Sequence, residues 1–306
     1  MRILITGGAG YLGAMTSQLL SESGHTVICL DTKKKPDSWN EKNSLFKGIR
    51  YVQGSVCDSA LVEKVTANID AIVHMSFIVG GPATHQNPEQ ARTLALDGTD
   101  IVSTVAKDRI LLFTSTDAIY SDDFQGELCD ETASCAPNSM YGELKVAAEN
   151  RVREVKQPII LRLPTHFGVS VSMRQDLLVH TLVRDMYKFG KLEIYEAQNL
   201  RTLIHIKDSA EAIRFSLENS SKITGDVYNV ASGVWTKGEI AHTIAEISGG
   251  AITLSNDQMD SSIIAKRNFA LNCNKFQAFG WKPQRCDLKQ GITELWEYFQ
   301  KSNFKN

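Results

Sequence analysis

Residues 2–13, RILITGGAGYLG, decide the fold of this chain. The run 2–6 is apolar and rich in β-branched residues, which is typical of a buried strand. A glycine pair ends it, and apolar residues then recur at helical spacing as far as Gly24, a residue type that ends helices. A second apolar run, 26–30, follows directly. A strand, a helix and a strand within about thirty residues predict a right-handed βαβ unit with parallel strands.

The same alternation continues along the chain. Continuous apolar strands between helices predict an open parallel sheet that is covered on both faces. We therefore predict an α/β protein: a Rossmann-type doubly wound parallel sheet over 1–164, completed by part of 201–232, and a smaller C-terminal α/β substrate domain, mainly 165–306. The further strands are expected at 49–53, 71–74, 109–114 and 158–163, the helices around 61–65, over 88–106 and over 141–155, and three more helix starts at the capping patterns of Asp208, Thr236 and Asp287.

The composition excludes several classes of protein. Of 306 residues, 42% are hydrophobic and 22% charged, which is ordinary for a globular chain. A net charge of −2 gives no electrostatic reason to expect nucleic acid or an anionic membrane as a partner. No apolar run is long enough to span a bilayer and no leader precedes the first strand, so we expect a cytoplasmic protein. The 6 cysteines lack paired or metal-ligand spacing, and we expect free thiols and no metal site.

The glycines of residues 7–13 predict a dinucleotide site. Gly7 permits a tight turn, Gly10 lets the backbone approach a pyrophosphate, and Gly13 lets the helix pack closely on the strand. The helix N-terminus then offers unpaired N–H groups to the phosphates. Asp31, at the tip of the second strand, is placed to accept the ribose hydroxyls, which favours NAD over NADP. The lysines at 33–35 are interpreted as a solvated loop rather than as a 2′-phosphate site.

A reactive pair is expected on the helix over 141–155. Tyr141 and Lys145 stand at i and i+4, on one face. A lysine beside a tyrosine stabilises the phenolate, and so lowers a phenol pKa that is otherwise about 10, as a base near neutral pH requires. Thr116, at the end of the preceding strand, carries a hydroxyl that can share the proton transfer. Together these groups can deprotonate a secondary alcohol while its carbon loses hydride to a nicotinamide.

Taken together, the motifs resemble the extended short-chain dehydrogenase/reductases, specifically the NAD-dependent nucleotide-sugar epimerase/dehydratase family. The likeness covers nearly the whole chain: T-G-G-x-G-x-x-G at 6–13, S-S/T-x-x-x-Y at 115–120, Y-x-x-x-K at 141–145 and R-D-x-x-x-V-x-D at 201–208. The resemblance implies NAD-dependent oxidation at C4 of a nucleotide-activated sugar, by a 4-epimerase or a 4-dehydrogenase with Tyr141 as the base. It also implies a homodimer through the helices 88–106 and 141–155.

The resemblance further implies the residues of the site. The expected catalytic residues are Thr116, Tyr141 and Lys145. Those expected at the cofactor are Gly7, Gly10, Tyr11, Leu12, Gly13, Asp31, Ser55, Val56, Met75, Ser76, Tyr141 and Lys145. Those expected at the substrate are Thr116, Asp117, Thr165, Arg174 and Arg201. The two arginines carry the guanidinium fork that suits a diphosphate.

Departures from the family pattern bear on the substrate. Ser55 stands where an aspartate usually contacts adenine, Ala95 stands where an asparagine is expected, and V-H-x-A-A reads V-H-M-S-F at 73–77. Asp117 is followed by Ala118, where the 4,6-dehydratase branch has glutamate, so sugar dehydratase activity is not expected. Residues 165–179, with Arg267, resemble a sub-branch of sugar C4 dehydrogenases and uncharacterised epimerases of surface-polysaccharide pathways.

Two other functions stay open at this point. One is an oxidoreductase or reductase of a small non-nucleotide alcohol or ketone, and the other is a non-catalytic NAD(H)-sensing protein. The nucleotide carrier of the sugar is not determined by any pattern in the chain. His74 is interpreted as a core histidine. His85 is either a substrate contact or a solvated loop residue, and Asp117 either orients a sugar hydroxyl or caps a turn.

Overall fold

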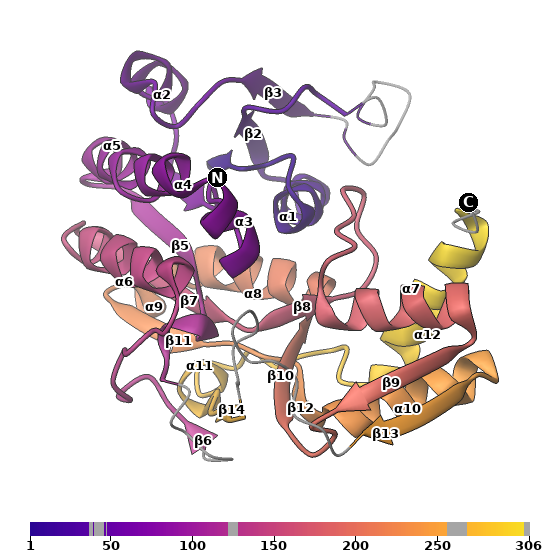
Figure 1. Cartoon of the computed structure of the whole chain (residues 1–306). Helices are drawn as coiled ribbons and strands as arrows, with labels where there is room; N and C mark the ends of the chain where they lie inside the picture. Colours follow the sequence, from indigo (N-terminus) through magenta and orange to yellow (C-terminus); the bar gives the residue numbers. More distant parts are fainter. Residues whose placement is uncertain (37–38, 40–45, 47, 122–127, 256–267, 303–306) are drawn as a thin grey trace.

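A seven-stranded parallel sheet forms the larger part of the molecule (Figure 1). The computed structural model describes residues 1–36, 39, 46, 48–121, 128–255 and 268–302. The strands of the sheet, in spatial order, are β11 (Asp226–Asn229), β7 (Gln157–Leu163), β5 (Ile110–Thr116), β4 (Ala71–His74), β1 (Arg2–Thr6), β2 (Thr26–Asp31) and β3 (Ile49–Gln53). Every neighbouring pair is parallel. The predicted doubly wound sheet is therefore confirmed, and its order reverses between β1 and β4, where such folds bind ligands.

Each face of this sheet has its own apolar core. Successive residues of a strand point to opposite faces, so Ile3 and Ile5 join the core under one layer of helices and Leu4 joins the other. The first layer consists of α1 (Tyr11–Glu22) and α8 (Ile206–Glu218). The second consists of α2 (Ser59–Thr66), α5 (Asp97–Ala106) and α6 (Met140–Arg153), with α4 (Pro88–Ala95) packed beside α5 and α6.

The prediction of a single helix over 88–106 is wrong, because this segment forms two helices, α4 and α5. The chain breaks at Leu96, which ends α4 and precedes α5. Asp97 and Asp100 lie in the first turn of α5, where carboxylates favour a helix start. A Cβ on Gly98 would lie 2.8 Å from the side chain of Val56, so the glycine lets α5 approach the segment after β3 closely. Apolar periodicity alone does not reveal such a break, because it continues across Leu96.

The smaller part of the molecule contains short sheets and helices with a core of their own. One sheet joins β12 (Gly233–Thr236), β10 (Leu200–His205) and β8 (Thr165–Phe167), a second pairs β13 (Ala251–Ser255) with β9 (Lys191–Tyr195), and a third pairs β14 (Ala270–Leu271) with β6 (Leu128–Cys129). The helices α7 (Leu178–Phe189), α10 (Lys237–Ser248) and α12 (Leu288–Lys301) pack against one another. The remaining short helices are α3 (Gly81–Gln86), a 3₁₀ turn (Asp117–Ile119), α9 (Ser220–Ile223) and α11 (Asn274–Gln277).

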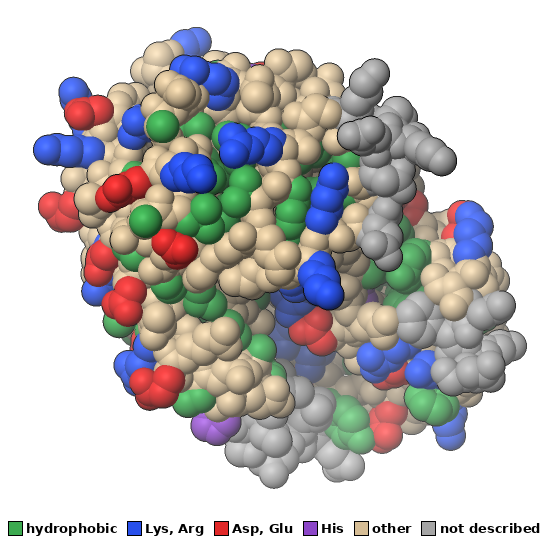
Figure 2. Space-filling view, turned by 90° about the horizontal axis from the view of Figure 1, so that it is seen from above, with side chains coloured by type: hydrophobic (Ala, Val, Ile, Leu, Met, Phe, Trp, Pro, Cys, Tyr) green, Lys and Arg blue, Asp and Glu red, His purple; other side chains and the backbone are tan. Residues whose placement is uncertain are grey.

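A hollow separates the larger and the smaller part when the molecule is viewed from above (Figure 2). Lys and Arg side chains gather along it, with acidic side chains among them. All six cysteines are free thiols. In the described part of the chain, no helix has both the length and the apolarity that a membrane span requires. The division of the chain into domains at residue 164 stays a prediction.

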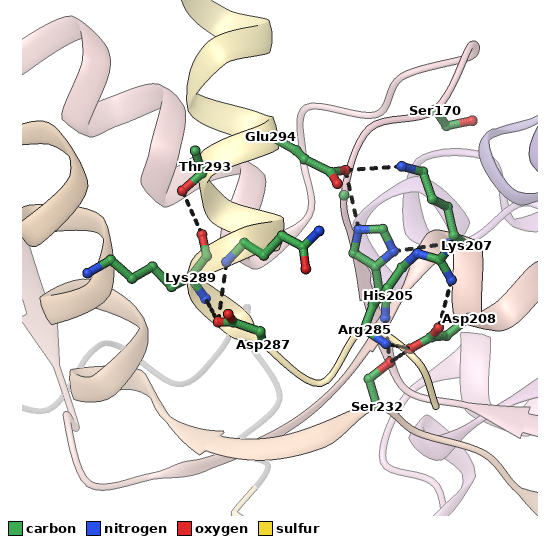
Figure 3. Close-up of polar contacts among 12 residues, drawn as sticks. Ser170, His205, Lys207, Asp208, Ser232, Arg285, Asp287, Lys289, Thr293 and Glu294 are labelled. Atoms are coloured by element: carbon green, nitrogen blue, oxygen red, sulfur yellow. Dashed lines mark hydrogen bonds and ion pairs between the residues drawn. The ribbon is translucent and has the colours of Figure 1, made fainter. Parts of the chain in front are cut away.

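Two of the three predicted helix starts are confirmed, and the third is wrong. Thr236 forms a capping box at the start of α10, and the Asp287 carboxylate accepts the first N–H groups of α12. Helix α8 instead begins at Ile206, two residues before the predicted Asp208. Asp208 is buried, and its carboxylate accepts hydrogen bonds from Ser232 Oγ (2.7 Å) and from Arg285 (Figure 3). Because the carboxylate is bound to Arg285, it does not cap the start of α8, and the cap residue is His205 instead.

Candidate active site

The glycine turn between β1 and α1 has the shape that a pyrophosphate requires. Gly7 has a positive φ of 72°, and its carbonyl accepts the Gly10 N–H at 3.0 Å. A Cβ on Gly13 would lie 2.1 Å from that carbonyl oxygen, so only glycine lets α1 start here. Gly10 is the N-cap of α1 and makes no side-chain cap bond. The first N–H groups of a twelve-residue helix therefore face the approach to the turn, which suits phosphate.

Asp31 stands beside this turn at the end of β2. One carboxylate oxygen accepts the Ala9 N–H at 3.0 Å, and the other accepts the Lys33 N–H at 3.0 Å. These bonds fix the carboxylate next to the turn, at the position expected for a ribose contact. Lys33 and the two lysines that follow are exposed, in agreement with the interpretation of a solvated loop. Residues 55 and 56 follow the neighbouring strand β3, with Ser55 Oγ accepting the Cys57 N–H and the Val56 side chain buried.

Met75 and Ser76 close the other side of the turn. Both donate their N–H groups to Thr6 Oγ1, at 3.1 Å and 3.3 Å. A Cβ on Gly7 would lie 3.0 Å from the Met75 carbonyl carbon, so the two strand ends are in close contact. His74 is a core histidine: it is fully buried between the hydroxyls of Thr6 (2.8 Å) and Thr99 (3.1 Å). Burial lowers the pKa of His74 to about 3, so its ring is neutral.

The predicted reactive residues meet at the end of β5. Thr116 is the last residue of this strand, and its hydroxyl accepts the Ala118 N–H (3.2 Å) and contacts Asp117 Oδ1 (3.3 Å). Helix α6 begins beside it, capped by Ser139. A Cβ on Gly142 would lie 2.5 Å from the Ala118 carbonyl oxygen, so this glycine allows the helix start to touch the strand end. Tyr141, one residue earlier, is thereby brought to the strand end that carries Thr116.

Lys145 lies one helical turn after Tyr141 and points back to the same strand. Its ammonium donates to the Thr114 carbonyl at 2.7 Å and lies 6.0 Å from the centre of the Tyr141 ring. The side chain is 3% exposed. Burial lowers the pKa of Lys145 to about 7, and the charge of Glu149 acts in the opposite direction. In its charged form, Lys145 is a buried cation close to a phenol, the electrostatic arrangement expected for a tyrosine base.

Arg174 reaches the reactive pair from the smaller part of the molecule. Its guanidinium forms a bidentate pair with Asp176, at 3.0 Å and 2.5 Å. Burial opposes its charge, but Asp176 and the nearby phenols of Tyr141 and Tyr11 raise the pKa of Arg174 above its ordinary value. The position that a Cβ on Gly80 would occupy is 4.0 Å from this guanidinium. Arg174 therefore lies beside Gly80, and the phenols of Tyr141 and Tyr11 are near enough for their charges to act on it.

Thr165 and Arg201 lie in a different sheet. Thr165 begins β8 and pairs with Leu203 of β10, and Arg201 stands two residues before Leu203 in that strand. The Arg201 guanidinium donates to the Leu200 carbonyl at 2.7 Å. These two residues belong to the smaller part of the molecule rather than to the strand end that carries the reactive pair. His85 is exposed on α3, and Arg267 lies outside the described residues.

Sequence reasoning missed a set of contacts that join the glycine turn to Arg174. The Tyr11 hydroxyl donates to the Gly168 carbonyl at 2.7 Å, and Ser170 Oγ donates to the Tyr11 carbonyl at 2.7 Å. His180 Nδ1 bonds the Arg174 carbonyl oxygen at 2.5 Å, and its Nε2 lies 3.4 Å from the Tyr11 hydroxyl. The partners of Tyr11 lie between 157 and 169 residues away in the sequence, and no local pattern predicts these contacts.

The fold and the glycine turn define the class of Rossmann-type dinucleotide-binding proteins. Within that class, the chain belongs to the NAD dependent epimerase/dehydratase family, whose model matches residues 3–231. NAD is the cofactor of this family. The residues of this structure fit it, because the glycine turn leads into the N-terminus of α1 and Asp31 is held beside that turn, where the adenosine ribose is expected.

Similar proteins from three organisms illustrate the range of the family. The low-salt glycan biosynthesis protein Agl12 of Haloferax volcanii is 27% identical over 98% of this chain and 98% of its own length. A dTDP-glucose 4,6-dehydratase of Streptomyces niveus is 27% identical over 98% of this chain and 93% of its own. The solved UDP-glucose 4-epimerase of Thermus thermophilus, in complex with NAD, has a TM-score of 0.82 at 22% identity, covering 98% of this chain and 99% of that one. This last likeness shows the fold.

Proposed function

We propose that the protein uses NAD to oxidise C4 of a nucleotide-activated sugar, as a 4-epimerase or a 4-dehydrogenase. The observation that carries the proposal is the meeting of Thr116, Tyr141 and Lys145 at the end of β5. Only β4 separates this strand from β1, which leads into the glycine turn. A base at the end of β5 and a nicotinamide reached from that turn can therefore act on one carbon atom.

The proton of the sugar 4-hydroxyl would go to the Tyr141 phenolate oxygen. The Thr116 hydroxyl would hydrogen-bond the same sugar oxygen and hold it in line. An ammonium has three N–H donors, and Lys145 uses one for the Thr114 carbonyl, so two are left for the phenol oxygen and a ribose hydroxyl. Its positive charge favours the phenolate. NAD, when bound, supplies the acceptor for the hydride of C4.

Arg174 and Arg201 are proposed to hold the diphosphate of the substrate. Arg174 is the better placed for the reacting sugar, because the Tyr141 phenol is near enough to act on its charge, and its pair with Asp176 keeps the planar guanidinium in one orientation. Arg201 and Thr165 would contact the substrate from the second sheet. Asp117 is 5% exposed and adjoins the Thr116 hydroxyl, which supports a role in orienting a sugar hydroxyl.

Residue 118 argues against a 4,6-dehydratase, although the Streptomyces niveus relative has that activity. Elimination across C5 and C6 requires a group that removes the C5 proton and an acid that protonates the departing oxygen. Ala118 supplies no titratable group. Its N–H is bonded to Thr116, and its carbonyl oxygen lies against the Gly142 backbone. Of the two adjacent positions 117 and 118, Asp117 alone carries a carboxylate, whereas the elimination asks for two acid–base groups.

The proposal also includes the cell compartment and the assembly. We place the enzyme in the cytoplasm, in the supply of sugars for a surface polysaccharide, and the glycan-biosynthesis relative from Haloferax volcanii supports this context.

We further propose a homodimer through α4, α5 and α6. Sedimentation equilibrium of the purified chain tests the dimer, and a monomer at micromolar concentration would refute it.

The deciding experiment identifies the product. The purified protein is first assayed for bound NAD(H), then incubated with UDP-, dTDP-, GDP- and CDP-hexoses, and the sugars are analysed by chromatography and mass spectrometry. We expect a 4-epimer or a 4-keto sugar of unchanged C6. A 4-keto-6-deoxy sugar would show that the enzyme is a dehydratase after all. Tyr141→Phe should abolish conversion, and Tyr298→Phe, on α12, is the matched control that keeps it.

A further inference from the structure

A phenylalanine covers the ammonium of the proposed catalytic lysine. Phe77 follows β4 and occupies the last position of the V-H-x-A-A stretch, where alanine is the family residue. The Lys145 nitrogen lies 3.6 Å from the centre of the Phe77 ring and 4.6 Å from that of Phe113. The two rings are themselves 5.5 Å apart and tilted by 52°. The ammonium is thus held by a backbone carbonyl and by the faces of two aromatic rings.

The carboxylate one helical turn after Lys145 on α6 is bound by arginines, so it compensates little for the cost of burying the lysine charge. Glu149, one turn further along α6, is bound to Arg162 at 2.9 Å and lies 3.6 Å from Arg153. His74 lies on the β4 side and is neutral, and Tyr141 lies on the α6 side. An isolated buried ammonium is costly, whereas the negative face of an aromatic ring attracts a cation, and more strongly when water is excluded. The Phe77 ring, the closest of these groups after the Thr114 carbonyl, therefore stabilises the charged form.

We propose that Phe77 is a positioning residue that acts through Lys145: its ring face keeps the ammonium charged and fixed against the Thr114 carbonyl, beside Tyr141. The role in the reaction rests on the function proposed above. The attraction of the ring opposes the effect of desolvation, which favours a neutral amine. A neutral Lys145 would no longer stabilise the phenolate of Tyr141, so the loss of the ring would weaken the base.

The first test measures Lys145 directly in the full chain, without substrate. The protein is labelled with ¹³C-lysine, the Lys145 signal is assigned with Lys145→Arg, and its pKa is measured by NMR titration. Phe77→Leu keeps an apolar side chain without a π face, so we expect the pKa of Lys145 to fall by about one unit. Phe77→Tyr keeps the ring and should leave it unchanged. Phe189→Leu removes an exposed ring on α7 and is the control; Phe77→Met replaces Phe77→Leu should the latter not fold.

The second test asks whether the ring matters to turnover. With the nucleotide sugar that the wild-type protein converts, the pH profile of kcat in Phe77→Leu should have its ascending limb, which follows deprotonation of Tyr141, shifted to higher pH, and Phe77→Tyr should restore it. Equal pKa values of Lys145 in wild type and Phe77→Leu would overturn the proposal, even in an active enzyme. If no nucleotide sugar is converted, the proposed function fails, and the titration still decides whether Phe77 holds the ammonium.

Discussion

Replacing Gly13 by alanine should damage both the fold and the cofactor site. A Cβ at this position would lie 2.1 Å from the Gly7 carbonyl oxygen and 2.8 Å from the Gly8 Cα. Both are backbone atoms, so no side chain can rotate away, and the turn must open by more than about 1 Å to restore van der Waals contact. Forcing an extra carbon into a packed site costs about 1–3 kcal/mol, and a rigid backbone places this site near the upper end.

The assay compares thermal unfolding with NAD binding by calorimetry. At an unfolding entropy of about 2.1 cal/mol/K per residue, a loss of about 3 kcal/mol in a chain of 306 residues corresponds to a fall in Tm of about 5 °C. Gly13→Ala should show that fall together with weaker NAD binding. Gly10→Ala is the informative contrast: its Cβ would meet only the Gly7 oxygen, at 3.1 Å, so it should lower the affinity for NAD with a smaller change in Tm. Gly81→Ala, whose Cβ would have no heavy atom within 4 Å, is the control. A Gly13→Ala protein that melts and binds NAD as the wild type does would refute the reasoning.

Three further predictions concern carboxylates. Asp31→Ala should weaken NAD binding about tenfold or more, because a hydrogen-bond acceptor for the ribose is lost. It should also reduce the ratio of the affinity for NAD to the affinity for NADP, because a charge that repels the 2′-phosphate of NADP is removed; calorimetry with both dinucleotides measures the two affinities. Glu149→Ala should lower the free energy of unfolding by about 3–5 kcal/mol in urea titrations, because it leaves the buried guanidinium of Arg162 unpaired; a change below about 1 kcal/mol would contradict this. Hydrogen bonding to His205 and the charge of Lys207 lower the pKa of Glu294 to about 2. The pKa of Glu294 is lower in the folded protein than in the unfolded chain, so its charge stabilises the folded state above about pH 4.5, and this stabilisation is lost as the pH falls toward 2. The difference in Tm between wild type and Glu294→Gln should therefore shrink over that pH interval.

Local patterns predicted the sheet well. The strands at 49–53 and 71–74 have the predicted bounds. The strand at 71–74 is fully buried, as expected of an apolar run in a parallel sheet, whereas the strand at 49–53 lies at the edge of the sheet and is partly exposed. The glycine spacing predicted a turn that the structure forms, since Gly7 and Gly13 meet conditions that act within one βαβ unit. The close packing of Tyr141 and Lys145 with the end of β5 was predicted for the same reason: the i, i+4 rule and the order of strand and helix are local facts.

Contacts between residues that are far apart in the sequence could not be predicted from local patterns. Asp208 carries a helix-start pattern, but a guanidinium 77 residues later binds its carboxylate. Arg174 was a candidate for the diphosphate, yet nothing in its surroundings in the chain indicates that the Tyr141 phenol acts on its charge. The ring of Phe77 over Lys145 was signalled only as a departure from alanine, with no hint of what the larger side chain touches. Such contacts depend on how segments far apart in the sequence pack together.

The most direct test of the account follows the hydrogen of C4. The NAD-loaded protein is mixed with UDP-glucose or dTDP-glucose deuterated at C4, quenched within one turnover, and the released cofactor is examined by mass spectrometry. We expect deuterium on the reduced nicotinamide with the sugar that is a substrate, and a rate at least about a hundredfold lower in Tyr141→Phe, since a positioned base contributes on that order. A cofactor that carries no deuterium during the turnover, or a Tyr141→Phe protein as fast as the wild type, would contradict oxidation at C4 by this tyrosine.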